Sequence, residues 1–201
     1  MMGGTGVVSR DALRRTTAPA LLCERARRAP NDVAFRSKHL GIYRERTFRD
    51  YALLVSQTAQ AFAALRVTKG ERVAIMGDVC EEWLICDLAA QSLGAIVYGI
   101  YPTAAPAEVE YQMRDGGAAL FIAEDQEYVD RILPLIDRLP GVRAIITIDA
   151  SAMFGYDHPK LMSYKTLVAA QKGDLDWLEA RAAAIRPEDP AFIVYTSGTT
   201  G

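Results

Sequence analysis

Residues 71–100 read ERVAIMGDVCEEWLICDLAAQSLGAIVYGI, and this stretch decides the fold. Two short apolar runs, Arg72–Met76 and Ala95–Ile100, stand at its ends. Between them, Asp78 stands where it would cap a helix, and the first turn of that helix is acidic, which the positive end of a helix favours. Two apolar strands joined by one helix indicate a βαβ unit, in which the strands run parallel and are buried on both faces.

The same alternation continues toward the C-terminus. A second helix is predicted to begin near Pro106, because proline suits the first helical position. The run Ala118–Ile122 follows, then helical spacing over Tyr128–Leu139, and then a fourth apolar run at Arg143–Ile148. We therefore predict an α/β fold with a largely parallel, doubly wound sheet that has helices on both faces.

The segments around this unit are predicted from turn and cap signals. A hairpin is expected around Gly41, between the strands Val33–Arg36 and Ile42–Arg46. The capping-box sequence Thr47–Asp50 then starts a long helix, which Lys69-Gly70 is expected to stop.

The chain is divided on the same evidence. Residues 1–15 are expected to be disordered, and residues 16–201 to form one partial domain. Within that domain, residues 71–150 are the βαβ core, and residues 191–201 are a strand plus a loop.

Composition excludes several classes of protein. The 201 residues contain 23 basic and 25 acidic side chains, a formal net charge of −2, unlike the basic balance of a general nucleic-acid-binding protein. Three cysteines without a C-x-x-C pair fit neither a zinc knuckle nor a disulfide framework. The most apolar stretch, Leu88–Tyr101, has 14 residues, fewer than the roughly 20 that cross a bilayer. We expect a cytoplasmic protein without a transmembrane segment, with peripheral attachment to a membrane as the alternative.

The charge is distributed unevenly along the chain. Residues 1–50 carry 11 basic and 5 acidic side chains, a net charge of +6, whereas residues 51–201 carry a net charge of −8. The arginines at positions 14–28 fit a contact with an anionic lipid or a nucleotide, but a solvated helix face is the interpretation that we favour.

The last segment of the chain carries the clearest chemistry. An apolar strand, Ala191–Tyr195, leads directly into TSGTTG, residues 196–201. Glycines let backbone N–H groups converge on phosphate oxygens, and neighbouring hydroxyls add donors or reach a magnesium ion. The spacing is not that of the Walker motif, and clusters of this composition also form ordinary turns. Because ligands bind at the carboxyl ends of parallel strands, the position after a buried strand favours phosphate binding.

Two stretches of the chain resemble one known family. Tyr195–Gly201 is similar to the phosphate loop of the adenylate-forming ligases, the AMP-binding superfamily of acyl-CoA synthetases, adenylation domains and luciferases. Gly70–Ile75, Trp83 and Gly94–Thr103 resemble the opening of that fold, particularly in long-chain fatty acyl-CoA synthetases. The likeness runs from about residue 16 to the end, so the chain resembles the N-terminal portion of the adenylate-forming ligase fold.

The resemblance implies a two-step, ATP-dependent ligation. A fatty acid carboxylate attacks the α-phosphorus of Mg·ATP to give an acyl-adenylate and pyrophosphate, and coenzyme A as co-substrate then displaces AMP to form a thioester. The Thr196 hydroxyl is implied as a candidate neighbour of Mg²⁺. The β- and γ-phosphates are implied to contact six residues: Thr196, Ser197, Gly198, Thr199, Thr200 and Gly201.

No catalytic residue is expected within the chain. In the family, the catalytic lysine, the acidic magnesium ligand and most of the acyl pocket follow the phosphate loop, so the resemblance implies that these 201 residues alone are inactive. Three other interpretations fit the residues: an acyl-AMP ligase acting on a carrier protein, a non-catalytic truncated nucleotide-binding remnant, and a free-standing flavodoxin-like module. An exposed apolar strand at 191–195 would also favour self-association through the sheet edge. The acid itself is not determined, because a fold does not fix a substrate.

Overall fold

The computed structural model of the protein describes residues 15–196. The segment expected to be disordered lies outside the described residues apart from Arg15, and so do residues 197–201 of the predicted loop. The elements follow one another in this order: α2 (Ala18–Arg28), β1 (Val33–His39), β2 (Ile42–Thr47), α3 (Phe48–Ala64), β3 (Arg72–Met76), α4 (Glu81–Ser92), β4 (Ile96–Ile100), α5 (Pro106–Gly116), β5 (Ala118–Ala123), α6 (Gln126–Ile132), the 3₁₀ helix η1 (Leu133–Arg138), β6 (Ala144–Thr147), β7 (Leu161–Ser163), α7 (Tyr164–Ala169), α8 (Leu175–Ala182) and β8 (Phe192–Ile193).

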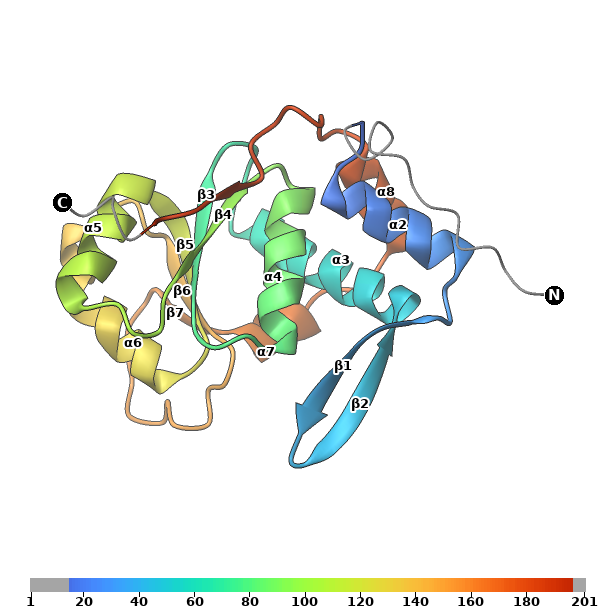
Figure 1. Ribbon diagram of the computed structural model, residues 1–201. Helices are drawn as coiled ribbons and strands as arrows, with labels where there is room; N and C mark the ends of the chain where they lie inside the picture. Colours follow the sequence, from blue (N-terminus) through green and yellow to red (C-terminus); the bar gives the residue numbers. More distant parts are fainter. Residues whose placement is uncertain (1–14, 197–201) are drawn as a thin grey trace.

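A six-stranded sheet with the order β7-β6-β5-β3-β4-β8 forms the centre of the molecule. Every neighbouring pair of strands in it is parallel. Helices α3 and α4 lie on one side of this sheet, and α5 and α6 lie on the other (Figure 1). The predicted fold class, a doubly wound α/β sheet with helices on both faces, is therefore confirmed.

Residues of the central strands alternate between two apolar cores. Val73 and Ile75 of β3 pack with α3 and α4, whereas Ala74 and Met76 pack with α5 and α6. All four side chains are almost fully buried. Because both faces are covered, the strands need no polar face, and this explains why they stand in the sequence as continuous apolar runs.

Two predicted helix ends differ from the structure. Helix α3 ends at Ala64, and Arg66 takes the left-handed position after it with φ of 62°, so Lys69-Gly70 does not stop the helix. Cys80, without a side-chain cap hydrogen bond, is the N-cap of α4. The backbone N–H of Asp78 donates instead to a carboxylate oxygen of Glu124, 2.5 Å away, so the predicted cap at Asp78 is wrong.

Two other segments are more finely divided than the sequence predicts. The helical spacing over Tyr128–Leu139 corresponds to α6 followed by η1, with Pro134 at the start of the 3₁₀ turn, where its missing N–H is not needed.

Strand β7 has three residues and was not predicted, since so short an edge strand shows no recognisable alternation of apolar and polar residues. None of the described helices is long and apolar enough to cross a membrane.

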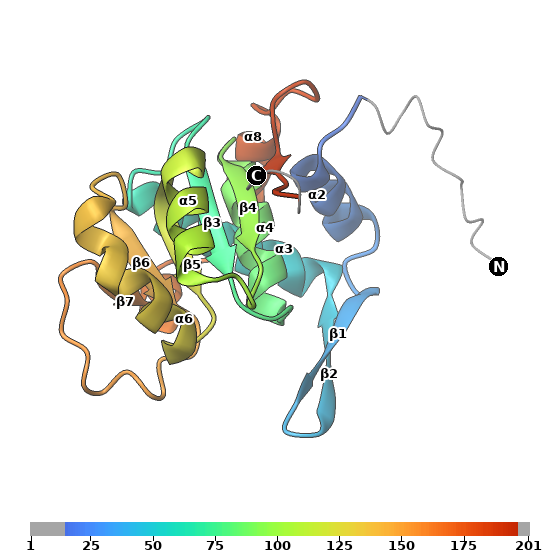
Figure 2. The ribbon, with the colours of Figure 1, turned by 60° about the vertical axis from the view of Figure 1, so that its left-hand side comes forward.

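The hairpin β1–β2 forms a separate two-stranded antiparallel sheet. Its base packs on the body: the Phe35 ring meets Tyr51 of α3 edge-on at 5.0 Å, and Ser37 and Arg46 both donate to the Glu81 carboxylate of α4. The far end of the hairpin projects away from the sheet and its helices in both views (Figures 1 and 2).

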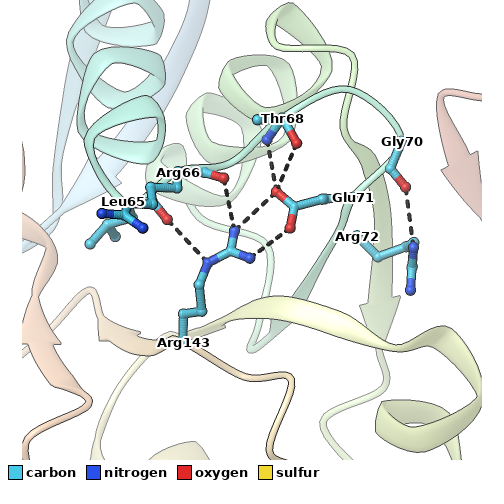
Figure 3. A network of polar contacts seen from close by, with 7 residues as sticks. All are labelled: Leu65, Arg66, Thr68, Gly70, Glu71, Arg72 and Arg143. Carbon is cyan, nitrogen blue, oxygen red and sulfur yellow. Dashed lines mark hydrogen bonds and ion pairs between the residues drawn. The ribbon is translucent and has the colours of Figure 1, made fainter.

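An arginine clamp ties α3 to the sheet (Figure 3). The Arg143 guanidinium donates to the backbone carbonyl oxygens of Leu65 and Arg66, both at 3.1 Å. It also donates to both carboxylate oxygens of Glu71, at 2.6 and 3.0 Å. The same carboxylate accepts from the Thr68 N–H at 2.8 Å. Arg143 thus satisfies carbonyls that the end of a helix leaves without partners.

The clamp predicts a pH-dependent stability. The Arg143 hydrogen bonds hold the Glu71 pKa below its ordinary value of 4.5, against the effect of burial. The charged form therefore stabilises the fold above about pH 4.5, and this contribution is lost as the pH falls through the lowered pKa. We expect Glu71→Gln to lower the free energy of unfolding at pH 7 by about 1 kcal/mol, since the pair is partly exposed.

Urea unfolding of both proteins between pH 7 and pH 3 measures this difference, which should shrink toward zero at the acid end. Glu24→Gln is the matched control, because Glu24 pairs with Arg28 on the exposed surface of α2, and its effect should stay within about 0.5 kcal/mol throughout. A Glu71→Gln difference that is the same at pH 3 and pH 7 would contradict the role of the Glu71 charge.

Candidate functional site

Parallel pairing brings the carboxyl ends of β3, β4, β5 and β8 to one edge of the sheet. After β4 the chain passes through α5 and crosses β3 to reach β5, which is the other neighbour of β3. Strand β8 pairs with the edge of β4 that faces away from β3. The connections therefore diverge next to β4. Such a topological switch point is where open α/β sheets bind their ligands.

A cleft of about 370 Å³ opens beside this point. Its wall is mostly apolar, and the Trp83 ring of α4 lies so close to Gly99 that a Cβ atom there would come within 3.3 Å of it. The carboxyl group of Asp87 borders the cleft. Burial raises the pKa of Asp87, and the Gln91 side chain donates to it at 2.9 Å. The residues that line the cleft include Trp83, Asp87, Gly99, Tyr101, Phe192 and Val194.

Tyr195 fixes the chain where it leaves β8. Its hydroxyl donates to the Asp115 carboxylate at 2.8 Å, and its ring meets those of Tyr98 at 5.7 Å and Tyr111 at 6.4 Å, both edge-on. Burial and the adjacent Asp115 carboxylate raise the pKa of the Tyr195 hydroxyl, so it stays a hydrogen-bond donor. Three aromatic rings from β4, α5 and the end of β8 thus hold the start of the predicted loop in one place.

Gly116 makes room for this aromatic group. A Cβ atom at Gly116 would lie 2.6 Å from the Tyr98 ring and 2.7 Å from its hydroxyl oxygen. Such distances are too short for any side chain, so glycine is needed at the end of α5 if Tyr98 is to stay under Tyr195.

The structure describes one of the six predicted phosphate-loop residues. Thr196 is exposed and follows Tyr195 at the carboxyl edge of the sheet. Ser197, Gly198, Thr199, Thr200 and Gly201 lie outside the described residues, so their predicted phosphate contacts stay predictions. The predicted magnesium contact of Thr196 stays a prediction as well.

A second polar feature at this edge was not found from the sequence. Gly77 follows β3 with φ of 154°, and a Cβ atom there would lie 2.4 Å from the Glu124 side chain that follows β5. Burial is the main cause that raises the Glu124 pKa, and the neighbouring Asp125, Asp78 and Glu82 carboxylates add to it. A glutamate directly after an apolar run is the one sequence signal by which this position could have been found.

The acidic side chains at this edge, as far as the structure describes them, are not arranged to hold a metal ion. Within residues 15–196, no group of three or more His, Cys, Asp or Glu side chains is placed to hold a metal ion. The exposed Thr196 fits a magnesium ion that arrives with a polyphosphate, because Mg²⁺ commonly keeps its waters and takes few protein ligands.

Comparison with known proteins gives the family. The model of the family described as AMP-binding enzyme matches residues 22–201. The chain belongs to the AMP-binding enzyme family. Among curated members, a long-chain-fatty-acid–CoA ligase FadD15 of Mycobacterium bovis is 30% identical over 182 residues, which are 90% of this chain and 29% of that protein. The Drosophila melanogaster long-chain-fatty-acid–CoA ligase heimdall is 28% identical over 158 residues, 77% of this chain and 23% of that protein.

Solved structures of ligases share the fold of this AMP-binding family member. The anthranilate CoA ligase AuaEII, in complex with anthranoyl-AMP, superposes with a TM-score of 0.74 and 27% identity, over 92% of this chain and 32% of that one. The acetoacetyl-CoA synthetase of Streptomyces lividans reaches the same TM-score at 19% identity, over 91% and 29%. The chain thus spans less than a third of the length of these relatives.

The aromatic anchor leads to a prediction about local stability. We expect Tyr195→Phe to raise the hydrogen-exchange rate of the β8 amides about fivefold, because it removes a hydrogen bond worth about 1 kcal/mol and keeps the ring. Tyr156→Phe is the control: it removes the bond that Tyr156 donates to Asp130 and the one that it accepts from Gln126, in a loop that follows β6, and should leave β8 unchanged. Equal exchange of β8 in the wild type and Tyr195→Phe would mean that the aromatic rings alone hold the segment.

Proposed function

We propose that this chain provides the triphosphate-binding edge of an ATP-dependent fatty acid–CoA ligase. The observation that carries the proposal is the placement of Thr196: it follows β8 at the carboxyl edge of a parallel sheet, next to a switch point, and leads into a run of hydroxyl residues and glycines. Membership of the AMP-binding family and the names of its relatives support the reaction class.

The chemical task of this edge is to stabilise leaving pyrophosphate. When a carboxylate attacks the α-phosphorus, negative charge grows on the β- and γ-phosphates. Hydroxyl and backbone N–H donors that are already oriented stabilise this charge without reorganising. Tyr195, held between Asp115 and two tyrosine rings, supplies that orientation at the start of the loop.

Substrates and setting follow from the same proposal. Mg·ATP is held by Thr196 to Gly201, with the Thr196 hydroxyl beside the ion. The coenzyme A thiol then displaces AMP from the acyl-adenylate to form a thioester, as the names of the CoA ligase relatives suggest. We also propose that the protein is cytoplasmic. It is expected to self-associate at high concentration, because Phe192 and Val194 at the edge of the sheet are 65% and 64% exposed.

The 201-residue chain is expected to be catalytically silent. Because the chain spans less than a third of the length of its relatives, we expect pyrophosphate exchange with Mg·ATP and a fatty acid not to rise above the buffer rate. A full-length long-chain fatty acid–CoA ligase run in parallel is the positive control. Exchange by the purified chain would contradict this prediction directly.

Nucleotide binding tests the phosphate-loop assignment separately. We expect saturable binding of radiolabelled Mg·ATP in equilibrium dialysis, and an affinity about tenfold lower for Thr196→Val, which loses one hydrogen bond to a charged group and keeps the side-chain shape. Thr166→Val is the matched control, because Thr166 is an exposed threonine on α7. Absence of binding by the wild-type chain, or equal loss in both variants, would overturn the assignment.

A further inference from the structure

The far end of the β1–β2 hairpin exposes three large apolar side chains together. Leu40, Ile42 and Tyr43 are 89%, 69% and 67% exposed. The strand register places them at the closed end of the hairpin. This end of the hairpin projects from the body (Figure 2). A globular protein normally keeps such side chains apart or covers them, so this group marks a contact surface.

The turn between the strands makes the choice of leucine unusual. His39 pairs with Ile42, so Leu40 and Gly41 form a two-residue turn, and both have positive φ, 48° and 83°. Hairpin turns of this kind favour Asn or Gly at the first position, because a leucine Cβ crowds the backbone there. Leucine weakens its own turn, and its exposed side chain gains no packing in return. Strain kept without a benefit inside the described range 15–196 points to a contact beyond it.

Two cations flank the apolar group, and neither has an acidic partner among residues 15–196. Arg36 pairs with Glu45, and Arg46 pairs with Glu81. Lys38 and Arg44 form no ion pair with any residue in the described range 15–196, and the Lys38 ammonium lies 5.8 Å from the Tyr43 ring. The hairpin is thus basic in a chain whose net charge is −2.

We propose that this hairpin tip, defined as Lys38, Leu40, Ile42, Tyr43 and Arg44, docks on an anionic lipid bilayer. The apolar side chains enter the interface while the two cations meet lipid phosphates, the combination by which peripheral proteins bind membranes. The shape favours a bilayer over a protein partner. A stable protein interface buries about 800 Å² on each side, and the end of a two-stranded ribbon does not offer such an area, whereas fluid lipid accommodates a convex tip.

Docking through the tip would also orient the molecule. Ser37 and Arg46 bind Glu81, in the first turn of the helix that follows β3, so the hairpin is attached at the carboxyl edge of the sheet. That edge is the one at which the proposed function places ATP. The bilayer contact itself needs neither ligand.

Vesicle sedimentation without ATP or fatty acid tests the inference. The 201-residue chain should bind vesicles of 70% phosphatidylcholine and 30% phosphatidylglycerol, bind pure phosphatidylcholine much more weakly, and be released by salt, which screens surface charge. Because no ligand is present, failure here leaves the ATP-binding test unaffected. Equal binding to both kinds of vesicle, or none to the anionic ones, would overturn the proposal.

Leu40→Asn separates docking from folding. Asparagine suits the left-handed turn position, so the variant should melt at the same temperature or higher while its vesicle partition coefficient falls about tenfold, the low end of what burial of one leucine contributes. Phe154→Asn is the matched control, because Phe154 is 98% exposed in another loop, between Asp149 and Asp157. Equal losses in both variants would overturn the assignment to the hairpin.

A second pair of variants tests the charges. Lys38→Gln/Arg44→Gln should lower the partition coefficient about 30-fold, since each basic side chain near an anionic leaflet contributes about fivefold. Lys165→Gln/Lys172→Gln changes the net charge of the chain equally at exposed sites elsewhere and should have little effect. Binding that depended on the hairpin cations but not on Leu40 would identify a site for soluble polyanions and overturn the bilayer proposal.

Discussion

Parallel pairing of β3 with both β4 and β5 is the constraint on which the rest of the structure depends. Parallel neighbouring strands need crossover connections. The crossover from β3 to β4 through α4 and the crossover from β4 to β5 through α5 run in opposite directions along the sheet, so their helices lie on opposite faces. Helices therefore cover both faces, and the strand residues between them become wholly apolar. The same pairing sends Asp78, Tyr101, Glu124 and Thr196 to one edge, although they lie far apart in the sequence.

Much of this arrangement could be predicted, because burial on both faces leaves a strong pattern. The strands β3, β5 and β6 are continuous apolar runs for that reason, and each was located within a residue or two. The strand expected to be buried at Ala191–Tyr195 is shorter in the structure: β8 covers Phe192–Ile193, pairs with β4 at the edge of the described sheet, and leaves Phe192 65% exposed. Helix ends were harder to predict. At Arg66 and Cys80, tertiary contacts and backbone geometry replace the glycine and aspartate that local rules expect.

Part of the candidate site could be predicted from neighbouring residues in the sequence, and part depends on residues that the fold brings together. Its loop sequence could be found because hydroxyls and glycines directly follow an apolar strand. The support for that loop could not be found, since the bond between Tyr195 and Asp115 joins residues 80 positions apart, and Gly116 matters only because Tyr98 lies against it. Neither Asp115 nor Gly116 belongs to a motif. Their roles arise from packing, which one sequence without its fold does not contain.

Two residues other than glycine adopt left-handed backbone conformations in the described chain, and their surroundings differ in an informative way. Arg66 closes α3, and the Arg143 guanidinium binds its carbonyl oxygen, so the strain belongs to a contact within the fold. Leu40 stands at the tip of a hairpin with its side chain in solvent. At Arg66, a hydrogen bond from Arg143 offsets the backbone strain. At Leu40, no contact of the exposed side chain within the described residues offsets it. The proposed bilayer contact would supply the compensation that Leu40 lacks within the described residues.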